Sequence, residues 1–164
     1  MERQLRKKKI LTVIASALLI AVYIIIFLFS AEDADASSSL SVEVTRKLMN
    51  LYYHLFSENN NAAFVAPAVS NEAEAIVRKM AHFTEYMTVG ILSFGIAVMW
   101  MRKIKVGMVA VTLQVFFSAV IDEIHQYFVP GRHASFRDVM IDTAGGIAGI
   151  FIIVCLNNIR KLRK

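Results

Sequence analysis

Residues 10–29 read ILTVIASALLIAVYIIIFLF, a stretch of 20 residues without a charged side chain. An α-helix of that length rises about 30 Å, which is enough to cross the hydrocarbon core of a membrane. Lysines and arginines crowd residues 1–9 before the stretch, and acidic residues follow it at 32–35. The stretch therefore predicts a membrane-spanning helix.

A cleaved signal peptide is the competing interpretation of this stretch. Residues 34–36, Ala-Asp-Ala, have the small-x-small pattern of a cleavage site. However, the apolar run is longer than the roughly 7–15 apolar residues of a signal peptide. We therefore expect the segment to be retained as an anchor.

The composition of the whole chain excludes several other classes of protein. Hydrophobic residues make up 57% of the 164 residues, whereas soluble domains contain about 45–50%. A chain this apolar is not disordered, and a single cysteine excludes a disulfide scaffold. That cysteine, Cys155, falls near the inner end of a predicted span, where we expect a structural role.

Three further apolar segments are long enough to cross a membrane, at residues 78–101, 106–129 and 138–157. The remaining segments are the termini and connections, at residues 1–9, 30–77, 102–105, 130–137 and 158–164. We therefore expect an all-α integral membrane protein with four transmembrane helices, forming a single domain over about residues 10–157.

The distribution of basic residues predicts how the spans are oriented. Alternating spans place residues 1–9, 102–105 and 158–164 on one side, with 12 of the 18 lysines and arginines and one of the 13 acidic residues. The positive-inside rule makes this side and both termini cytoplasmic, so segments 30–77 and 130–137 are extracytoplasmic. The membrane thus accounts for the net charge of +5, and we expect no nucleic-acid partner.

The long extracytoplasmic segment 30–77 contains an apolar stripe at helical spacing, formed by Leu40, Val44, Leu48, Leu51 and Leu55. This pattern predicts an amphipathic helix over about residues 40–57, resting on the outer membrane surface or capping the bundle. We favour packing against the bundle over a lid that gates a ligand site. Asn59–Asn61 and the region of Pro67 are typical of loops.

Ionisable residues of the last three spans lie at a common depth. Counted from the first cytoplasmic cation of each span, Glu85, Asp122 and Asp142 are 17 or 18 residues away, about 26 Å along an α-helix. His82 and His125 are each 20 residues away, about 30 Å. Charges that face lipid cost several kcal/mol. The common depth therefore predicts an inward-facing polar site at the outer edge of the hydrocarbon.

Helical spacing also places the polar residues of each span on one face. Glu123 lies about 100° away from the Asp122 face, as a flank, a headgroup contact or a partner of Arg132. The spacing of Gly145 and Gly149 predicts a close helix approach. The three faces consist of Arg78, His82, Glu85 and Tyr86, of Ser118, Asp122, His125 and Gln126, and of Asp138, Asp142, Gly145, Gly146 and Gly149.

The loop 130–137 predicts an anion-binding site. Pro130-Gly131 is typical of a tight turn, and Ser135 is placed to cap the helix that follows. Free amides at a helix start, together with the nearby Arg132, favour binding of a lipid phosphate or sugar-phosphate headgroup. Alternatively, Arg132 pairs with Asp122 or Glu123. Two more cations, Arg78 and Lys79, enter from the same side.

Three ordered motifs resemble the VanZ family of bacterial membrane proteins. They are Arg78-Lys79-x-x-His82-Phe83-x-Glu85-Tyr86, Asp122-Glu123-x-His125-Gln126-x-Phe128-x-Pro130-Gly131-Arg132 and Ser135-x-x-Asp138-x-x-x-Asp142-x-x-Gly145. The resemblance covers nearly the whole chain. It implies a bacterial plasma membrane, an envelope context and lowered sensitivity to teicoplanin, a lipid-tailed glycopeptide.

The site residues support more than one chemistry. A divalent metal such as zinc could be held by His82 with Glu85 and Asp122 with His125, completed by Asp138 or Asp142. Metal-free acid/base chemistry on a lipid-linked envelope precursor is a second hypothesis, with these six residues as catalytic candidates. Arg78, Lys79, Arg132 and Ser135 would bind the headgroup, with Tyr86, Glu123 and Gln126 in support.

Two non-catalytic hypotheses for the same residues remain. In one, the polar residues form only a closed structural hydrogen-bond network. In the other, the cavity binds a membrane lipid or the lipid tail of a lipoglycopeptide antibiotic without turnover.

Overall fold

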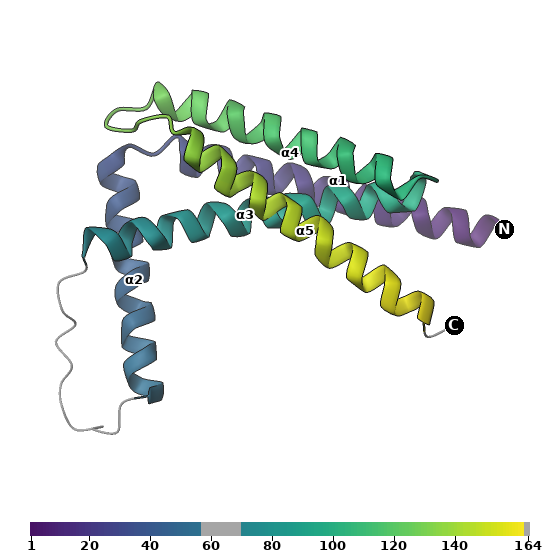
Figure 1. The fold of residues 1–164 in the computed structure, drawn as a ribbon, viewed down its shortest axis with the longest axis horizontal. Helices are drawn as coiled ribbons and strands as arrows, with labels where there is room; N and C mark the ends of the chain where they lie inside the picture. Colours follow the sequence, from purple (N-terminus) through teal and green to yellow (C-terminus); the bar gives the residue numbers. More distant parts are fainter. Residues whose placement is uncertain (57–69, 163–164) are drawn as a thin grey trace.

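The computed structural model describes residues 1–56 and 70–162, and the described residues form helices and no strands. The predicted loop positions 59–61 and 67, and the last two basic residues of the tail, lie outside the described residues. Figure 1 shows the helices in chain order: α1 (Glu2–Ser30), α2 (Ala34–Phe56), α3 (Asn71–Trp100), α4 (Ile104–Tyr127) and α5 (Phe136–Leu162).

Four of these helices are long and apolar enough to cross a membrane, namely α1, α3, α4 and the Phe136–Asn158 part of α5. This confirms the predicted all-α architecture with four spans. The helices extend beyond the apolar segments, because α1 already begins at Glu2 and α3 at Asn71. The early start of α3 is stabilised by Ser70, whose hydroxyl accepts a 3.2 Å hydrogen bond from the amide of Ala73.

The N-terminus, the turn between α3 and α4 and the end of α5 lie at one end of the helical bundle (Figure 1). Two hydrogen bonds hold α1 to α3 there. Trp100 Nε1 donates to Thr12 Oγ1 over 2.7 Å, and Lys8 Nζ donates to the Met99 carbonyl over 3.3 Å. The loop between α4 and α5 lies at the opposite end (Figure 1), which we call the far end.

Helices α3 and α5 approach each other closely because glycine lines their contact. A Cβ atom added at Gly145 would collide with the backbone of Phe83, and one added at Gly149 would collide with the Met87 carbonyl. No larger residue fits there unless the helices separate. The two glycines therefore do what their spacing predicted and bring α5 against the middle of α3.

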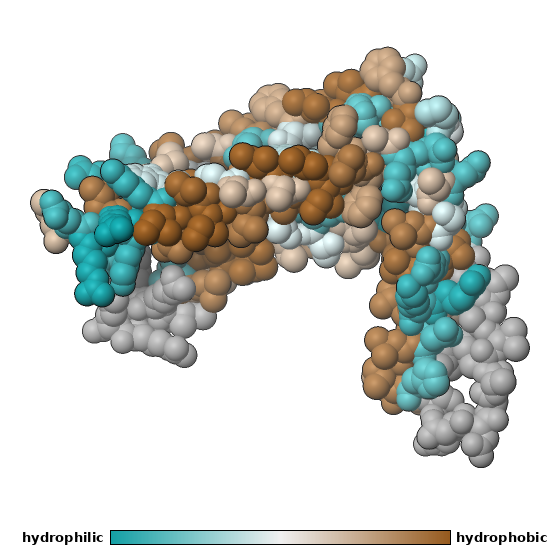
Figure 2. Space-filling model, turned by 180° about the vertical axis from the view of Figure 1, so that it is seen from behind, coloured by the Kyte–Doolittle hydropathy of each residue, from teal (hydrophilic) through white to brown (hydrophobic). Residues whose placement is uncertain are grey.

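The buried core is small and lies between the spanning helices. It includes Val89 and Phe94 of α3, Val115 of α4 and Ile150 of α5. Large apolar side chains on the outer faces are exposed, and Figure 2 shows them as a hydrophobic flank of the bundle. Such a surface is compatible with lipid contact and would be unusual for a protein in water.

Helix α2 crosses the far end of the bundle and points away from it (Figure 1). It begins at Ala34, earlier than predicted, and Asp33 Oδ1 accepts a 2.8 Å hydrogen bond from the amide of Ala36. Its buried side chains are Ser37, Ser41 and Thr45. Small hydroxyl side chains therefore form its contact with the bundle.

Helix α2 contacts α3, but the outer part of its apolar stripe takes no part in this contact. Leu48, Leu51 and Leu55 are 52%, 55% and 66% exposed. In Figure 2 the hydrophobic side of α2 faces the side along which the bundle extends, and its hydrophilic side faces away. This orientation is the one that an interfacial helix needs.

Candidate functional site

A cavity of about 250 Å³ lies at the far end of the bundle, and we call it the polar cavity. Helices α3, α4 and α5 and the loop after α4 contribute most of its wall. Ionisable or polar side chains in this wall are Arg78, Lys79, His82, Glu123, Gln126, Arg132, His133, Asp138 and Asp142. The structure thus gathers most of the predicted site residues around one space.

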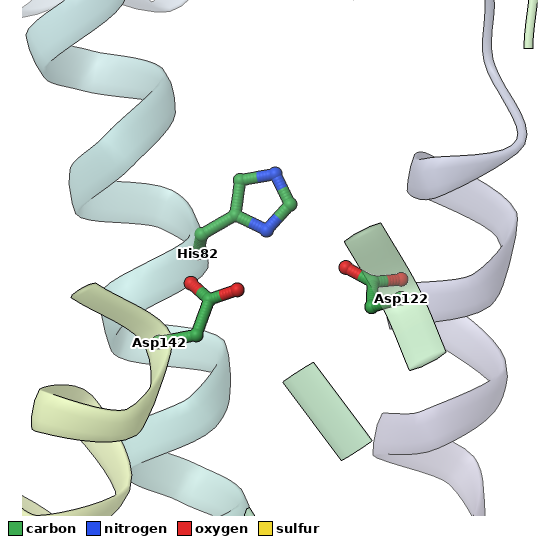
Figure 3. Close-up of side chains that lie close together, drawn as sticks. All are labelled: His82, Asp122 and Asp142. Atoms are coloured by element: carbon green, nitrogen blue, oxygen red, sulfur yellow. The ribbon is translucent and has the colours of Figure 1, made fainter. Parts of the chain in front are cut away.

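Three of the predicted residues form a tight cluster beside this cavity. His82 of α3, Asp122 of α4 and Asp142 of α5 each bring one nitrogen or oxygen atom to within 4.8 Å of the other two. Figure 3 shows the imidazole and the two carboxylates turned toward a common space. Both aspartates are buried, and His82 is half-buried.

Neighbouring side chains complete only part of the hydrogen bonding of this cluster. Gln126 Nε2 donates to Asp122 Oδ2 over 3.1 Å and to Ser30 Oγ over 3.2 Å. Glu85 Oε2 lies 3.8 Å from His82 Nδ1. His82 Nδ1 and Asp142 Oδ1 are buried without a hydrogen-bond partner. This is not the closed network expected of a purely structural arrangement.

Two of the three cations at the cavity already have acidic partners. Lys79 Nζ lies 3.4 Å from Asp138 Oδ1, and the Arg78 guanidinium lies 3.3 Å from Glu74 Oε1. The side chains of Arg78, Lys79 and Asp138 remain about one-third exposed. Lys79 can therefore turn toward a bound anion without leaving a buried charge unpaired, whereas Arg78 would leave the buried carboxylate of Glu74 with only the hydroxyl of Ser38.

Arg132 differs from the other two cations. Its Nη2 donates to the carbonyl of Phe29 over 3.0 Å, while its Nε is buried and has no hydrogen-bond partner. Within the described part of the chain it forms no salt bridge, so the alternative pairing with Asp122 or Glu123 is not formed. Burial lowers the pKa of the Arg132 guanidinium, and the nearby positive charge of Arg78 lowers it further.

Glu123 binds the backbone of the loop and does not pair with the side chain of Arg132. Its Oε2 accepts a 2.6 Å hydrogen bond from the backbone amide of Ser135. Ser135 directly precedes α5, as predicted, and its carbonyl accepts from the amides of Asp138 and Val139. The amide directly before the helix is thus bound by a carboxylate of the protein itself, and among the described residues the Ser135 hydroxyl forms no cap bond.

His125 lies on the other side of Asp122, away from His82. Its ring stacks on Phe27 with centroids 4.6 Å apart. Both line a second space of about 370 Å³ together with Tyr23, Ile26, Tyr86, Ser118, Ile121 and Asp122, which we call the apolar cavity. The expected four ligands His82, Glu85, Asp122 and His125 are therefore not gathered around one point.

Two residues that shape the site were not predicted from the sequence. Glu74 is buried, and it accepts hydrogen bonds from Ser38 Oγ of α2 over 2.8 Å and from Arg78 over 3.3 Å. Ser30, at the end of α1, is also buried and accepts from Gln126. The position of Glu74 one turn before Arg78 was a usable signal. A lone serine such as Ser30 gave none.

Comparison with known proteins assigns the chain to a family by its sequence. The family model described as VanZ/LLP1 matches residues 15–157, a range that includes every residue of the cluster and most of all four spans. No curated protein and no solved structure gives a significant match.

Proposed function

This chain belongs to the VanZ/LLP1 family, and from that premise we propose that it binds the phosphate-bearing headgroup of an envelope lipid or lipid-linked precursor in its polar cavity. We place the protein in the bacterial plasma membrane with both termini in the cytoplasm, so that the far end and its cavity face outward. The expectation rests on the basic residues gathered at the opposite end.

The observation that carries the proposal is the state of Arg132. It is a half-buried cation without a carboxylate partner, its Nε lacks a hydrogen bond, and it lines the cavity with Arg78 and Lys79. Phosphate oxygens accept hydrogen bonds from arginine in pairs and carry the opposite charge. A bound phosphate would therefore satisfy Nε and offset the repulsion between Arg132 and Arg78.

Apolar surface next to these cations supports a lipid over a soluble phosphate. A space of about 120 Å³ shares Arg78, His82 and Arg132 with the polar cavity, and Leu40 and Val44 of α2 also line it. The exposed apolar stripe of α2 continues from these two residues. An anionic headgroup in the polar cavity would thus lie beside surface that accepts an acyl or isoprenyl chain.

The cluster of His82, Asp122 and Asp142, next to the cations, could transfer protons as well as take part in binding. His82 and Asp142 line the polar cavity, and Asp122 lies between them and the apolar cavity. A histidine and carboxylates at this place could donate or accept a proton when a phosphate ester is hydrolysed or transferred. Lowered sensitivity to teicoplanin-type lipoglycopeptides would then follow from the altered envelope lipid.

Binding of the headgroup is tested with purified protein in detergent, using dioleoyl phosphatidic acid and a polyprenyl phosphate as probes. We expect Arg132→Gln to weaken binding at least about 30-fold, equivalent to about 2 kcal/mol, because a buried charge pair is lost. Arg137→Gln is the matched control, since Arg137 is exposed in the same loop and outside the cavity wall.

Two results would contradict the headgroup site. One is equal affinity of the Arg132→Gln and Arg137→Gln proteins for both phosphates. The other is equal affinity of the wild-type protein for these phosphates and for the matching neutral lipids, diacylglycerol and polyprenol.

Turnover is tested in cells. Lipids are extracted from strains with and without the protein and compared by mass spectrometry, because only an enzyme leaves a changed lipid pool. The same strains, with protein abundance held equal, are compared for teicoplanin sensitivity after His82→Ala and Asp142→Asn. If the lipid pools of strains with and without the wild-type protein are the same, the protein binds lipid without a chemical reaction.

A further inference from the structure

We propose that His82, Asp122 and Asp142 bind a divalent metal ion and that Zn²⁺ suits them best. The set offers one imidazole nitrogen and two carboxylate oxygens. Three protein ligands with one position left open are typical of zinc sites that activate water or polarise a substrate. The set differs from the one expected from helical spacing, because it includes Asp142 and excludes His125.

The geometry of the cluster is close to that of a bound site. The three donor atoms lie within 4.8 Å of one another and come from three different helices. Ligand atoms about 2.0–2.2 Å from a tetrahedral zinc ion are about 3.4 Å apart. Small side-chain rotations would close this difference, and α3 and α5 are already held together by their glycine contact.

The independent observation that points to a ligand is the state of Asp142. Its side chain is 1% exposed, and Oδ1 is buried without a hydrogen-bond partner. Among the described residues no cation forms a salt bridge with Asp142 or with Asp122. Two buried carboxylates facing each other without a cation cost free energy, which a divalent ion would offset.

Residues around the cluster are placed to orient the ligands. The carboxylate of Glu85 adds negative charge beside the imidazole, with its Oε2 3.8 Å from His82 Nδ1, the ring nitrogen that Figure 3 shows turned toward the two aspartates. Gln126 donates to Asp122 Oδ2, which leaves Oδ1 for coordination. Histidine and carboxylate ligands in metal sites regularly have such outer partners.

The open position faces the polar cavity, whose wall includes His82 and Asp142. A water molecule or a phosphate oxygen would fill it. The metal site extends the headgroup proposal and rests on it only for the identity of this last ligand.

The metal is tested on the full chain in lipid nanodiscs. The protein is stripped with a chelator, dialysed against buffered Zn²⁺ and analysed by elemental mass spectrometry. We expect about one zinc ion per chain for the wild type. Asp142→Asn and Asp122→Asn should bind zinc at least about 100-fold more weakly. Asp35→Asn is the matched control, because it removes the same charge from an exposed position at the far end, outside the cavity wall.

A second measurement reports the ligand set directly. Co²⁺ replaces the zinc, and its visible absorption depends on the number of coordinating atoms. The spectrum should be unchanged in Asp35→Asn and lost in Asp142→Asn. Wild-type protein without zinc above background would overturn the metal site, even if both cluster variants failed to fold. Preference for Mn²⁺ or Mg²⁺ over Zn²⁺ would overturn the choice of zinc.

The metal and headgroup proposals fail independently. Arg132→Gln should keep its zinc while losing the phosphate-bearing lipid. If the wild-type protein takes up no zinc but still binds the phosphate-bearing lipid, only the metal site is contradicted. Zinc binding with no preference for phosphate-bearing lipids would remove the headgroup site alone.

Discussion

The carboxylate of Glu123 on α4 accepts a 2.6 Å hydrogen bond from the backbone amide of Ser135, which directly precedes α5. The two residues close the loop between the helices, and that loop carries Arg132. Gly131 makes the turn possible, since its φ of 76° belongs to the left-handed region that other residues rarely adopt. A carboxylate that forms no salt bridge with Arg132 therefore helps to hold the loop that carries it.

Removing this carboxylate should loosen the loop. We expect Glu123→Ala to destabilise the loop by about 1–3 kcal/mol, because the Ser135 amide loses a charged acceptor. Glu123→Gln keeps an acceptor oxygen and should have a smaller effect. Hydrogen exchange of the loop amides, followed by mass spectrometry, measures both. Exchange equal to wild type in Glu123→Ala would show that the bond does not hold the loop.

Enlarging the glycines between α3 and α5 should destabilise the bundle. Gly145→Ala and Gly149→Ala each place a methyl group against the backbone of α3, and overpacking of this kind costs about 1–3 kcal/mol. Gly95→Ala is the control, because nothing lies within 4 Å of the added methyl group. Thermal unfolding in detergent should give a lower midpoint for the first two variants only. Equal midpoints for all three would contradict the close contact.

The two faces of α2 should meet different environments. In a Cys155→Ala background, spin labels are attached after Leu51→Cys on the apolar stripe or Glu43→Cys on the hydrophilic side. We expect the first label in lipid vesicles to be more accessible to oxygen and the second to a water-soluble nickel complex. Equal accessibility at both positions would contradict an interfacial orientation of α2.

The orientation of the spans can be tested in the same cysteine-free background. His133→Cys places a thiol in the exposed loop at the far end, and Lys103→Cys places one in the exposed turn after α3. A membrane-impermeant maleimide added to intact cells should label only the first, because the positive-inside rule makes the turn cytoplasmic. Labelling of Lys103→Cys without permeabilisation would reverse the orientation.

The spans and the depth of the site could be predicted from the sequence because both follow from counting along a helix. The 20 uncharged residues of the first span and the common depth of Asp122 and Asp142 depend only on rise per residue. The glycine contact was also accessible, since two glycines four residues apart share a face.

The rotation of each helix about its own axis could not be predicted in this way. His82 and His125 have the same spacing to a carboxylate and the same depth, yet only His82 faces Asp142. His125 is turned toward Phe27, because α4 also packs against α1. The stripe on α2 likewise predicted the helix but not its contact, because small hydroxyl side chains approach the bundle more closely than leucines do.

The last two residues of α1 give the first span a part in the cavity as well as in membrane insertion. The Phe29 carbonyl holds Arg132, and the Ser30 hydroxyl holds Gln126, which in turn holds Asp122. Proteolytic processing at residues 34–36 would therefore release both anchors at once. A processed chain would keep its motifs, yet its arginine and its aspartate would lose their positions together.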